Sequence, residues 1–329
     1  MTTRILIVGF GSIGRRHLRV ARSLNPDADI RVLRHAGGEA DANADGVIGS
    51  LRDALDFAPQ AAVLASPAPF HAATGVPLLE AGVAVLAEKP LAASAVDGRA
   101  LAAAAARSGA VLLLGYNLRY LPSLRRFREM VRGGDVGRVF SVRAEMGQYL
   151  PAWRPDSDYR QGVSARALLG GGVLLELSHE IDYLRWLFGD AAWVSATLAR
   201  LGGLEIDVED TVHMTLGFGE GAPVAQLDMD FLRHDTARRC TVIGETGTLR
   251  WDAIAGTVER FRDGGWTEVL RDRPERDFTY IAEWRHFQDC AEGRAAPLVG
   301  GGDGVAVLDI IEAARVSARE HRRCAIGAA

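Results

Sequence analysis

The sequence contains few cysteines and no long apolar run. Of its 329 residues only Cys240, Cys290 and Cys324 are cysteines, and no two of them form a C-x-x-C pair. That spacing argues against a disulfide framework and against cysteine-based zinc or redox sites, so we expect reduced thiols and a cytoplasmic protein. The alanine-rich run 101–106 is too short to span a bilayer and predicts a helix instead.

A large excess of charge of either sign is also missing. Lys and Arg number 38 against 42 Asp and Glu, a formal net charge of -4, and the arginines are spread along the chain. We therefore expect neither nucleic acid nor a membrane surface as a partner. Glycines interrupt the first apolar segment before a signal-peptide core forms, so export is not expected. The motif H-E-x-x-H is absent, and His179 lacks a second histidine at the required spacing, so we expect no metal.

What is present is a change of pattern near residue 121. A chain of 329 residues exceeds what one core usually serves, so we expect two domains. Residues 1–121 alternate apolar strands with helices, which predicts a doubly wound parallel sheet of the α/β class. Residues 122–329 begin with a helix and continue as long strands with short turns, which predicts an α+β domain. Apolar residues alternate over 212–218, so its large, mostly antiparallel sheet should pack helices on one face and be open on the other.

The first strand leads directly into a glycine motif. The apolar run 5–8 is followed by Gly9-Phe10-Gly11-Ser12-Ile13-Gly14, a G-x-G-x-x-G pattern that opens a helix. Such glycines permit a tight turn, close approach of the backbone to a pyrophosphate, and close packing of helix on strand. We therefore predict a Rossmann dinucleotide-binding domain over 1–121. The predicted phosphate-binding residues are Gly9, Gly11, Ser12, Ile13 and Gly14.

The end of the second strand bears on the choice of cofactor. Ile30–Leu33 is followed by Arg34, where NAD-selective proteins place an acidic residue. A guanidinium cannot accept a hydrogen bond from a ribose hydroxyl, but it can pair with a 2′-phosphate. We therefore expect NADP(H), with NAD(H) as the alternative if Arg34 only faces solvent.

The glycine-rich segment 170–189 predicts one amphipathic helix. Three glycines precede an apolar-periodic run, and Gly189 ends it. At 3.6 residues per turn, Glu176, His179 and Tyr183 fall together on a face opposite the apolar one. The helix should pack with one side and present an acid and an imidazole with the other. Taken alone, the pattern is also typical of a surface pair or of a histidine satisfied in a core.

Five motifs in order together resemble the glucose-fructose oxidoreductase, inositol dehydrogenase and rhizopine catabolism (Gfo/Idh/MocA) family. They are the glycine motif, Ser66-Pro67 with His71, Glu88-Lys89-Pro90, Asn117-Leu118-Arg119-Tyr120, and the segment from Gly170 to His179. The similarity covers nearly the whole chain, and Glu-Lys-Pro is its most specific motif. It implies an NAD(P)-dependent oxidoreductase that moves hydride between a nicotinamide and a secondary alcohol or ketone of a sugar, cyclitol or sugar acid.

The resemblance also implies how the parts are used. Residues 122–329 should form the substrate and oligomerisation domain, with helix 303–322 packing back on the first domain. The open sheet face should form homodimers or homotetramers. Further cofactor contacts are expected from the residues that follow the strands of the first domain: Ser66, Pro67, His71, Glu88, Lys89 and Asn117.

Lys89 and His179 are the expected proton-transfer groups. A positive charge beside the cofactor polarises a carbonyl or makes an alcohol more acidic, which suits Lys89. His179 is the usual general acid/base by resemblance, and either residue can carry the proton. Many family members have an Asp four residues before this histidine, where this chain has Leu175, so Glu176 is expected to orient the imidazole, fix its tautomer or contact a substrate hydroxyl instead. Asp182, one turn after His179, is a possible substitute, but we expect it to be a solvated helix acid. A salt bridge between Lys89 and Glu88 is the structural alternative.

The loop after the first strand of the second domain concentrates aromatic and arginine side chains. Such a loop suits a sugar face and its hydroxyl or acidic groups, or else a neighbouring subunit. Arg119 could equally hold the corner between the domains. The predicted substrate-binding residues are Lys89, Tyr116, Arg119, Tyr149, Trp153, Arg154, Arg166 and His179.

Two other functions are compatible with this sequence. One is a lyase or glycosidase that retains its cofactor and oxidises its substrate only transiently. The other is a regulator that senses NAD(P) without turnover, against which the presence of both Lys89 and His179 argues.

Overall fold

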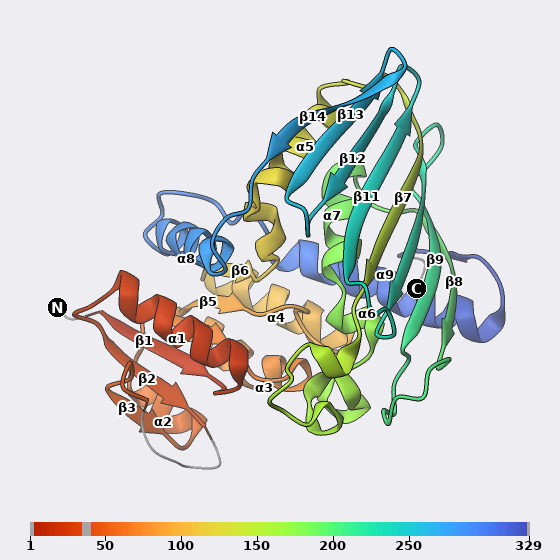
Figure 1. Cartoon of the computed structure of the whole chain (residues 1–329). Helices are drawn as coiled ribbons and strands as arrows, with labels where there is room; N and C mark the ends of the chain where they lie inside the picture. The colour runs from red at the N-terminus through yellow and green to blue at the C-terminus, as the bar shows by residue number, and fades with distance from the viewer. Residues whose placement is uncertain (1–2, 35–40, 328–329) are drawn as a thin grey trace. The chain divides into compact units, whose positions relative to one another are not determined.

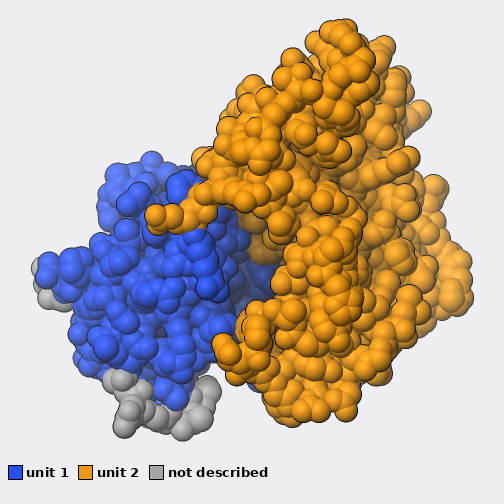
Figure 2. Space-filling model, in the orientation of Figure 1, with its two compact units in different colours: residues 1–117, 276–308 blue, residues 118–275, 309–329 orange. Residues whose placement is uncertain are grey.

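The computed structural model describes residues 3–34 and 41–327, which form two compact units. Unit 1 comprises residues 1–117 and 276–308, and unit 2 comprises residues 118–275 and 309–329 (Figure 2). Each has its own sheet (Figure 1). The expected combination of a Rossmann sheet and a mostly antiparallel sheet is confirmed.

Unit 1 is built on a six-stranded parallel sheet with the order β3-β2-β1-β4-β5-β6. Its strands are β1 (Arg4–Val8), β2 (Asp29–Leu33), β3 (Gly46–Ile48), β4 (Ala61–Leu64), β5 (Ala84–Ala87) and β6 (Leu112–Leu114). Its helices are α1 (Ser12–Leu24), α2 (Leu51–Asp56), α3 (His71–Glu80), α4 (Ala95–Ser108) and α8 (Phe278–Ala291). Consecutive residues of β1 and β5 are buried, because helices cover both faces of the sheet. The strand order reverses between β1 and β4, where open α/β sheets bind ligands.

Helix α8 belongs to unit 1, whereas residues 122–329 were expected to form the second domain, with only helix 303–322 packing on the first. Trp284, Phe287 and Cys290 of α8 lie in the same core cluster as Ile7 and Leu18. The first turns of helix α9 (Gly301–Glu320) also belong to unit 1, and the rest belongs to unit 2. Apolar periodicity predicts that a helix has a buried face, but not which core buries it.

Unit 2 carries a nine-stranded sheet with the order β14-β13-β12-β11-β7-β10-β9-β8-β15. Its strands are β7 (Val139–Gly147), β8 (Trp193–Ala199), β9 (Thr211–Gly217), β10 (Val224–Asp230), β11 (Ala237–Gly244), β12 (Thr248–Asp252), β13 (Thr257–Arg262), β14 (Gly265–Arg271) and β15 (Cys324–Ala325). Neighbours are antiparallel except β7 and β10. Helices α5 (Pro122–Arg132), α6 (Val173–Glu176) and α7 (His179–Phe188) contact strands of this sheet (Figure 1). Val142, Ala144 and Met146 of β7 are buried and Arg143 is exposed, so one face is packed and the other open.

The single helix expected over 174–188 is wrong, because a turn at Leu177 and Ser178 separates α6 from α7. The start of α6 is held by Glu209, whose carboxylate accepts a hydrogen bond from the Leu174 N–H at 3.0 Å. Helix α7 is held by Asp182 and Glu180, which pair with arginines elsewhere in unit 2. These distant partners fix the two short helices separately. The periodicity of residues 174–188 cannot predict such partners, because it reflects only neighbours within the segment.

Candidate active site

The glycine loop between β1 and α1 has the shape that a dinucleotide needs. Gly9 has φ +91°, and a Cβ atom added there would lie 2.7 Å from the Ser66 nitrogen. A Cβ at Gly14 would lie 2.2 Å from the Gly9 oxygen, whereas a Cβ at Gly11 would meet nothing within 4 Å. The outer glycines therefore permit contact within the protein, and the middle one borders open space. That open space over the backbone fits a pyrophosphate.

The first turn of α1 is suited to an anion. Gly11 is the N-cap residue, no side chain caps the helix, and its first turn contains no acidic residue. The first N–H groups of a helix have no partner within it, and the helix dipole is positive at this end. The residues present therefore fit a dinucleotide phosphate at Ser12 and Ile13.

Arg34 lies near the same loop. Its guanidinium carbon is 5.2 Å from the centre of the Phe10 ring, and that of Arg15 is 4.1 Å from the same ring. Phe10 is the second residue of the glycine motif. The end of β2 thus brings a guanidinium close to the loop, as a contact with the adenosine half of a cofactor requires.

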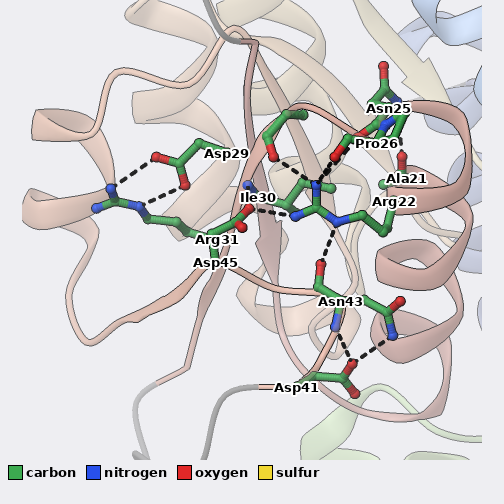
Figure 3. A network of polar contacts seen from close by, with 11 residues as sticks. Ala21, Arg22, Asn25, Pro26, Asp29, Ile30, Arg31, Asp41, Asn43 and Asp45 are labelled. Carbon is green, nitrogen blue, oxygen red and sulfur yellow. Dashed lines mark hydrogen bonds and ion pairs between the residues drawn. The ribbon is translucent and has the colours of Figure 1, made fainter.

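Arg22 of α1 anchors the segment that returns toward β3 (Figure 3). Its guanidinium donates to the backbone oxygens of Asn43 at 3.1 Å and Ala28 at 2.8 Å, and it pairs with Asp45. The Asp45 carboxylate also accepts the Ile30 N–H at 2.7 Å. That N–H, together with the Arg22 charge, lowers the pKa of Asp45 despite its partial burial. The network ties α1 to β2 and so holds in place the strand that Arg34 follows.

The other predicted residues of unit 1 follow β4, β5 and β6 at the same edge of the parallel sheet. His71 is buried, with Nε2 2.8 Å from the Ser66 oxygen and Nδ1 3.1 Å from the Leu91 oxygen. Burial lowers the pKa of His71, against the opposite effect of those two carbonyls. His71 therefore links the loop that contains Pro67 to the loop after Lys89 through their backbone oxygens.

Glu88 is buried and holds the backbone of the lysine beside it. Its Oε2 accepts the Lys89 N–H at 3.1 Å, and its Oε1 lies 2.7 Å from Nε2 of His17. Burial raises the pKa of Glu88, but the hydrogen bond from His17, the charge of Lys89 and the Lys89 N–H outweigh it, so the pKa is lowered. The carboxylate is therefore charged beside the ammonium of Lys89.

Two further predicted residues follow β6 and are buried. Tyr116 is fully enclosed, and Asn117 donates through Nδ2 to the Thr279 hydroxyl at 3.0 Å. Thr279 lies on α8, so this bond joins the end of β6 to that helix.

In unit 2, Glu176 and His179 lie on either side of the turn between α6 and α7, and both are half-buried. Glu176 accepts a hydrogen bond from the Ser164 hydroxyl at 2.9 Å. Tyr183, expected on the same accessible face, is buried instead, and its ring meets that of Trp251 at 5.4 Å. Burial, with smaller effects from Cys240 and Glu180, raises the pKa of Tyr183 well above its usual value. The expectation for Tyr183 is wrong because the turn changes which residues share a face.

The loop after β7 forms a small pocket within unit 2. It is lined by Leu150, Trp153, Arg154, Ser157, Asp158, Tyr159, Gly162 and Ser164. Trp153 donates its indole N–H to the Gln148 oxygen at 3.1 Å, so its ring is held in place. The pocket thus joins Trp153 and Arg154 to Ser164, the partner of Glu176. Two other predicted residues lie outside the lining: Tyr149 stacks on His234, and Arg166 donates to the Arg160 oxygen.

Arg119 and Asp182 form a buried pair in unit 2. The guanidinium donates to both carboxylate oxygens, at 3.0 Å and 2.7 Å, and the side chains are 4% and 1% exposed. Asp182 was expected to be a solvated helix acid, which is wrong. The carboxylate is buried, because the Arg119 guanidinium pairs with it inside the core. The structure thus places Arg119 in a two-pronged ion pair inside the unit.

Several residues of these networks were not singled out from the sequence. His17 and Glu283 lie beside Glu88, Trp284 donates a hydrogen bond to His17, and Glu209 holds the start of α6. His17 did leave a signal, since it lies three residues after Gly14 on the inner face of α1. The others come from distant segments and left none.

Two findings concern what the described residues lack. Within 3–34 and 41–327, three or more His, Cys, Asp or Glu side chains nowhere gather closely enough to hold a metal ion. In that same portion of the chain, each helix is too short or too polar to cross a membrane.

A glycine-lined turn at the switch point of a parallel sheet defines a dinucleotide-binding fold. Residues 3–116 match the model of the oxidoreductase family with an NAD-binding Rossmann fold, and residues 124–250 match the Gfo/Idh/MocA C-terminal domain. The chain therefore belongs to the Gfo/Idh/MocA family.

Similar proteins are known at low identity over almost the full length. A D-apiose dehydrogenase of Paraburkholderia graminis is 27% identical, over 96% of this chain and 88% of the relative. Inositol 2-dehydrogenase 3 of Saccharopolyspora erythraea is 28% identical, over 94% and 91%. The crystal structure of GenD2 from gentamicin A biosynthesis, in complex with NAD, has a TM-score of 0.82 at 28% identity and covers 99% of this chain and 97% of its own.

Proposed function

We propose that the protein is an NAD(P)-dependent dehydrogenase or reductase that acts on a CH–OH group of a sugar, cyclitol or sugar acid. The observation that carries the proposal is the position of Lys89. It follows β5 at the carboxyl edge of the parallel sheet, one strand from the β4 loop that contacts Gly9, and its backbone is held by a charged carboxylate. The names of the two curated relatives, which are sugar and cyclitol dehydrogenases, support the substrate class.

The residues divide into those that hold the cofactor and those that handle the proton. The nicotinamide, when bound, supplies or accepts the hydride. The loop from Gly9 to Gly14 would hold the pyrophosphate, with Arg34, Ser66, Pro67 and Asn117 around the rest of the dinucleotide. Lys89 would hydrogen-bond the reacting oxygen and exchange the hydroxyl proton with it, and His179 is the second group able to do so. Glu176 would keep the imidazole of His179 oriented, and Trp153 and Arg154 would bind the substrate.

Replacing Lys89 tests the proposal directly. In Lys89→Ala we expect hydride transfer to fall about 100-fold or more, the loss typical of a missing acid/base group, with cofactor affinity nearly unchanged. Lys89→Arg is the matched control, because it keeps a positive charge that does not release a proton near neutral pH. Stopped-flow absorbance of the nicotinamide with a panel of sugars and cyclitols measures the rate. Equal turnover of all three proteins would remove Lys89 from the mechanism.

The preference for NADP(H) over NAD(H) also remains a proposal. It is supported by the guanidinium of Arg34 near the glycine loop, whereas the similar GenD2 structure contains NAD. We expect Arg34→Leu to weaken NADP(H) binding about tenfold, the value of one charge-assisted hydrogen bond, and to leave NAD(H) binding nearly unchanged. Fluorescence titration with both cofactors decides this, and tighter binding of NAD(H) by the wild-type protein contradicts it.

We also propose a homodimer or homotetramer formed through the open face of the unit 2 sheet. Its support is the row of accessible side chains between buried ones, such as Arg143 on β7 and His213 on β9. Sedimentation equilibrium measures the oligomeric state, and a monomer at micromolar concentration contradicts the proposed assembly.

A cytoplasmic location is supported by the three cysteines, which are all unpaired thiols. The alternatives of a lyase or a sensing regulator are not favoured, because both curated relatives are dehydrogenases.

A further inference from the structure

A chain of hydrogen bonds runs through the interior of unit 1 to the backbone of Lys89. The indole N–H of Trp284 donates to Nδ1 of His17 at 2.9 Å. Nε2 of His17 lies 2.7 Å from Oε1 of Glu88, and Oε2 of Glu88 accepts the Lys89 N–H at 3.1 Å. The imidazole is fully buried and the indole is 1% exposed, so water does not compete for the bond between Trp284 and His17.

The chemistry of the three side chains fixes the proton on the imidazole. An indole nitrogen can only donate, so Nδ1 of His17 must be the acceptor. The ring proton is therefore on Nε2, where it points at the carboxylate of Glu88. His17 is a neutral imidazole with a single tautomer, and both of its nitrogens are engaged.

The same helix carries the cofactor loop and the imidazole. Helix α1 begins at Ser12, directly after the central glycine, and His17 lies on the inner face of its second turn. Glu88 immediately precedes Lys89 and reaches back to that residue's N–H. The distance from the phosphate-binding end of α1 to the lysine is thus set by His17 and Glu88, because hydrogen bonds at both ends of each side chain fix its position.

We propose that His17 is a positioning residue for the acid/base lysine: by holding the Glu88 carboxylate, it fixes Lys89 relative to the dinucleotide loop. This inference rests on the proposed function of Lys89. A positioning error of about 1 Å in a catalytic group can cost about 100-fold in rate, so a buried residue that sets this position affects turnover as well as folding.

The groups around the chain are consistent with this role. The ring of Tyr280 lies edge-on to that of His17, with 5.8 Å between the ring centres. The guanidinium carbon of Arg16 lies 4.7 Å from the centre of the Tyr280 ring. Glu283, beside Glu88, is fully buried, and its carboxyl oxygens have no hydrogen-bond partner among the residues that the structure describes. Burial, and then the charge of Glu88, raise the pKa of Glu283 well above its usual value. The protonated form of Glu283 is therefore favoured, and its carboxyl makes no hydrogen bond to His17.

The first test compares His17→Leu with His17→Gln. A glutamine can present an N–H to Glu88 and an oxygen to Trp284, whereas leucine fills the space without either group. We expect His17→Leu to lower kcat about 10- to 100-fold, with the dissociation constant of the cofactor changed less than about threefold. His17→Gln should recover most of that loss and should also restore the pH dependence of kcat, which we expect leucine to shift. A folded His17→Leu protein with wild-type kcat and pH profile overturns the proposal.

A pair of tryptophan variants separates positioning from stability. Trp284→Phe removes the indole N–H that donates to His17 at the first step of the hydrogen-bond chain. Trp251→Phe removes an equally buried donor in unit 2, whose partner is the Ser123 hydroxyl at 3.0 Å. Both should lower the unfolding temperature, but only Trp284→Phe should lower kcat, by about threefold or more. Equal effects of the two variants on kcat overturn the proposal, and the comparison stands even if His17→Leu fails to fold.

A readout without turnover keeps this inference distinct from the proposed function. In ¹⁵N NMR of the wild-type protein, His17 should show an Nε2-protonated neutral ring, and a ring protonated on Nδ1 overturns the hydrogen-bond chain. If Lys89→Ala keeps full activity, the proposed function fails, and the role of His17 fails with it, whatever the NMR result. If Lys89→Ala is inactive and His17→Leu is not impaired, the positioning role alone fails.

Discussion

The two units stabilise buried acids in different ways. In unit 2, Asp182 and Glu180 each pair with an arginine, at 2.7 Å and 2.8 Å. In unit 1, Glu88 is held by a neutral imidazole and a backbone N–H. A guanidinium cancels the charge where it lies, whereas neutral donors stabilise the carboxylate and leave its field to act on the adjacent lysine. The contrast suggests that the unit 2 pairs serve the fold, and that the unit 1 carboxylate serves the site.

The largest effect should come from breaking a pair of unit 2. Asp182→Ala leaves the Arg119 guanidinium buried without its carboxylate, which typically costs about 3–5 kcal/mol of the free energy of unfolding. Glu80→Ala breaks the exposed pair with Arg107 and should cost less than about 1 kcal/mol. Urea denaturation of both variants measures the difference. Similar losses would show that the Arg119 pair is no more than a surface contact, which removes one side of the contrast.

A smaller effect concerns unit 1, where backbone shape replaces side-chain pairs. Gly9→Ala places a Cβ at φ +91° against the Ser66 backbone and should cost about 1–3 kcal/mol through strain. Gly11→Ala points into open space and should cost only about 0.5 kcal/mol, yet it should still weaken cofactor binding. Thermal unfolding with and without cofactor tests both variants. If the two lose the same stability, the loop is not shaped by its outer glycines.

The third effect depends on pH and concerns Glu283. Burial and the charge of Glu88 raise the pKa of this carboxyl, so the folded state keeps a proton that the unfolded state has lost at neutral pH. The stability of the wild-type protein should therefore fall as pH rises above about 4.3, by about 1.4 kcal/mol per pH unit, until the pKa of the folded state is reached. Glu283→Gln lacks this group, so its advantage over the wild type should grow from pH 5 to pH 8.

The exposed substitution Glu80→Gln serves as the control, because it should give no such trend. Urea denaturation at the two pH values measures it. Parallel curves for Glu283→Gln and the wild type would mean that unit 1 buries two charged carboxylates, which contradicts a raised pKa of Glu283.

Much of the fold and part of the candidate site could be predicted because their signals are local. The run 5–8 followed by the glycine motif predicted β1, the turn and α1, since each depends on neighbours a few residues away. Alternation over 212–218 predicted a strand with one buried face for the same reason. The positions of Lys89 and Asn117 after β5 and β6 also followed from strand order alone.

The remaining features depend on partners far along the chain. The two short helices α6 and α7 are held by contacts with Glu209 and Arg119, on either side of the turn between them. Helix α8 belongs to unit 1 because it packs in a core that includes Ile7. Asp182 looked solvated because its periodicity places it on a polar face, and only the guanidinium 63 positions away explains its burial. No pattern within one helix contains such information.

By itself, the sequence determined the order of strands and helices, the dinucleotide loop and the chemical types of the candidate residues, because spacing and residue type act over short distances. The tertiary structure alone decided which buried acid meets a guanidinium and which meets His17, since the segments involved are joined only when the core forms. The same carboxyl group can therefore hold a helix in unit 2 and hold the backbone of Lys89 in unit 1. Its partner makes the difference, by either cancelling its charge or preserving it.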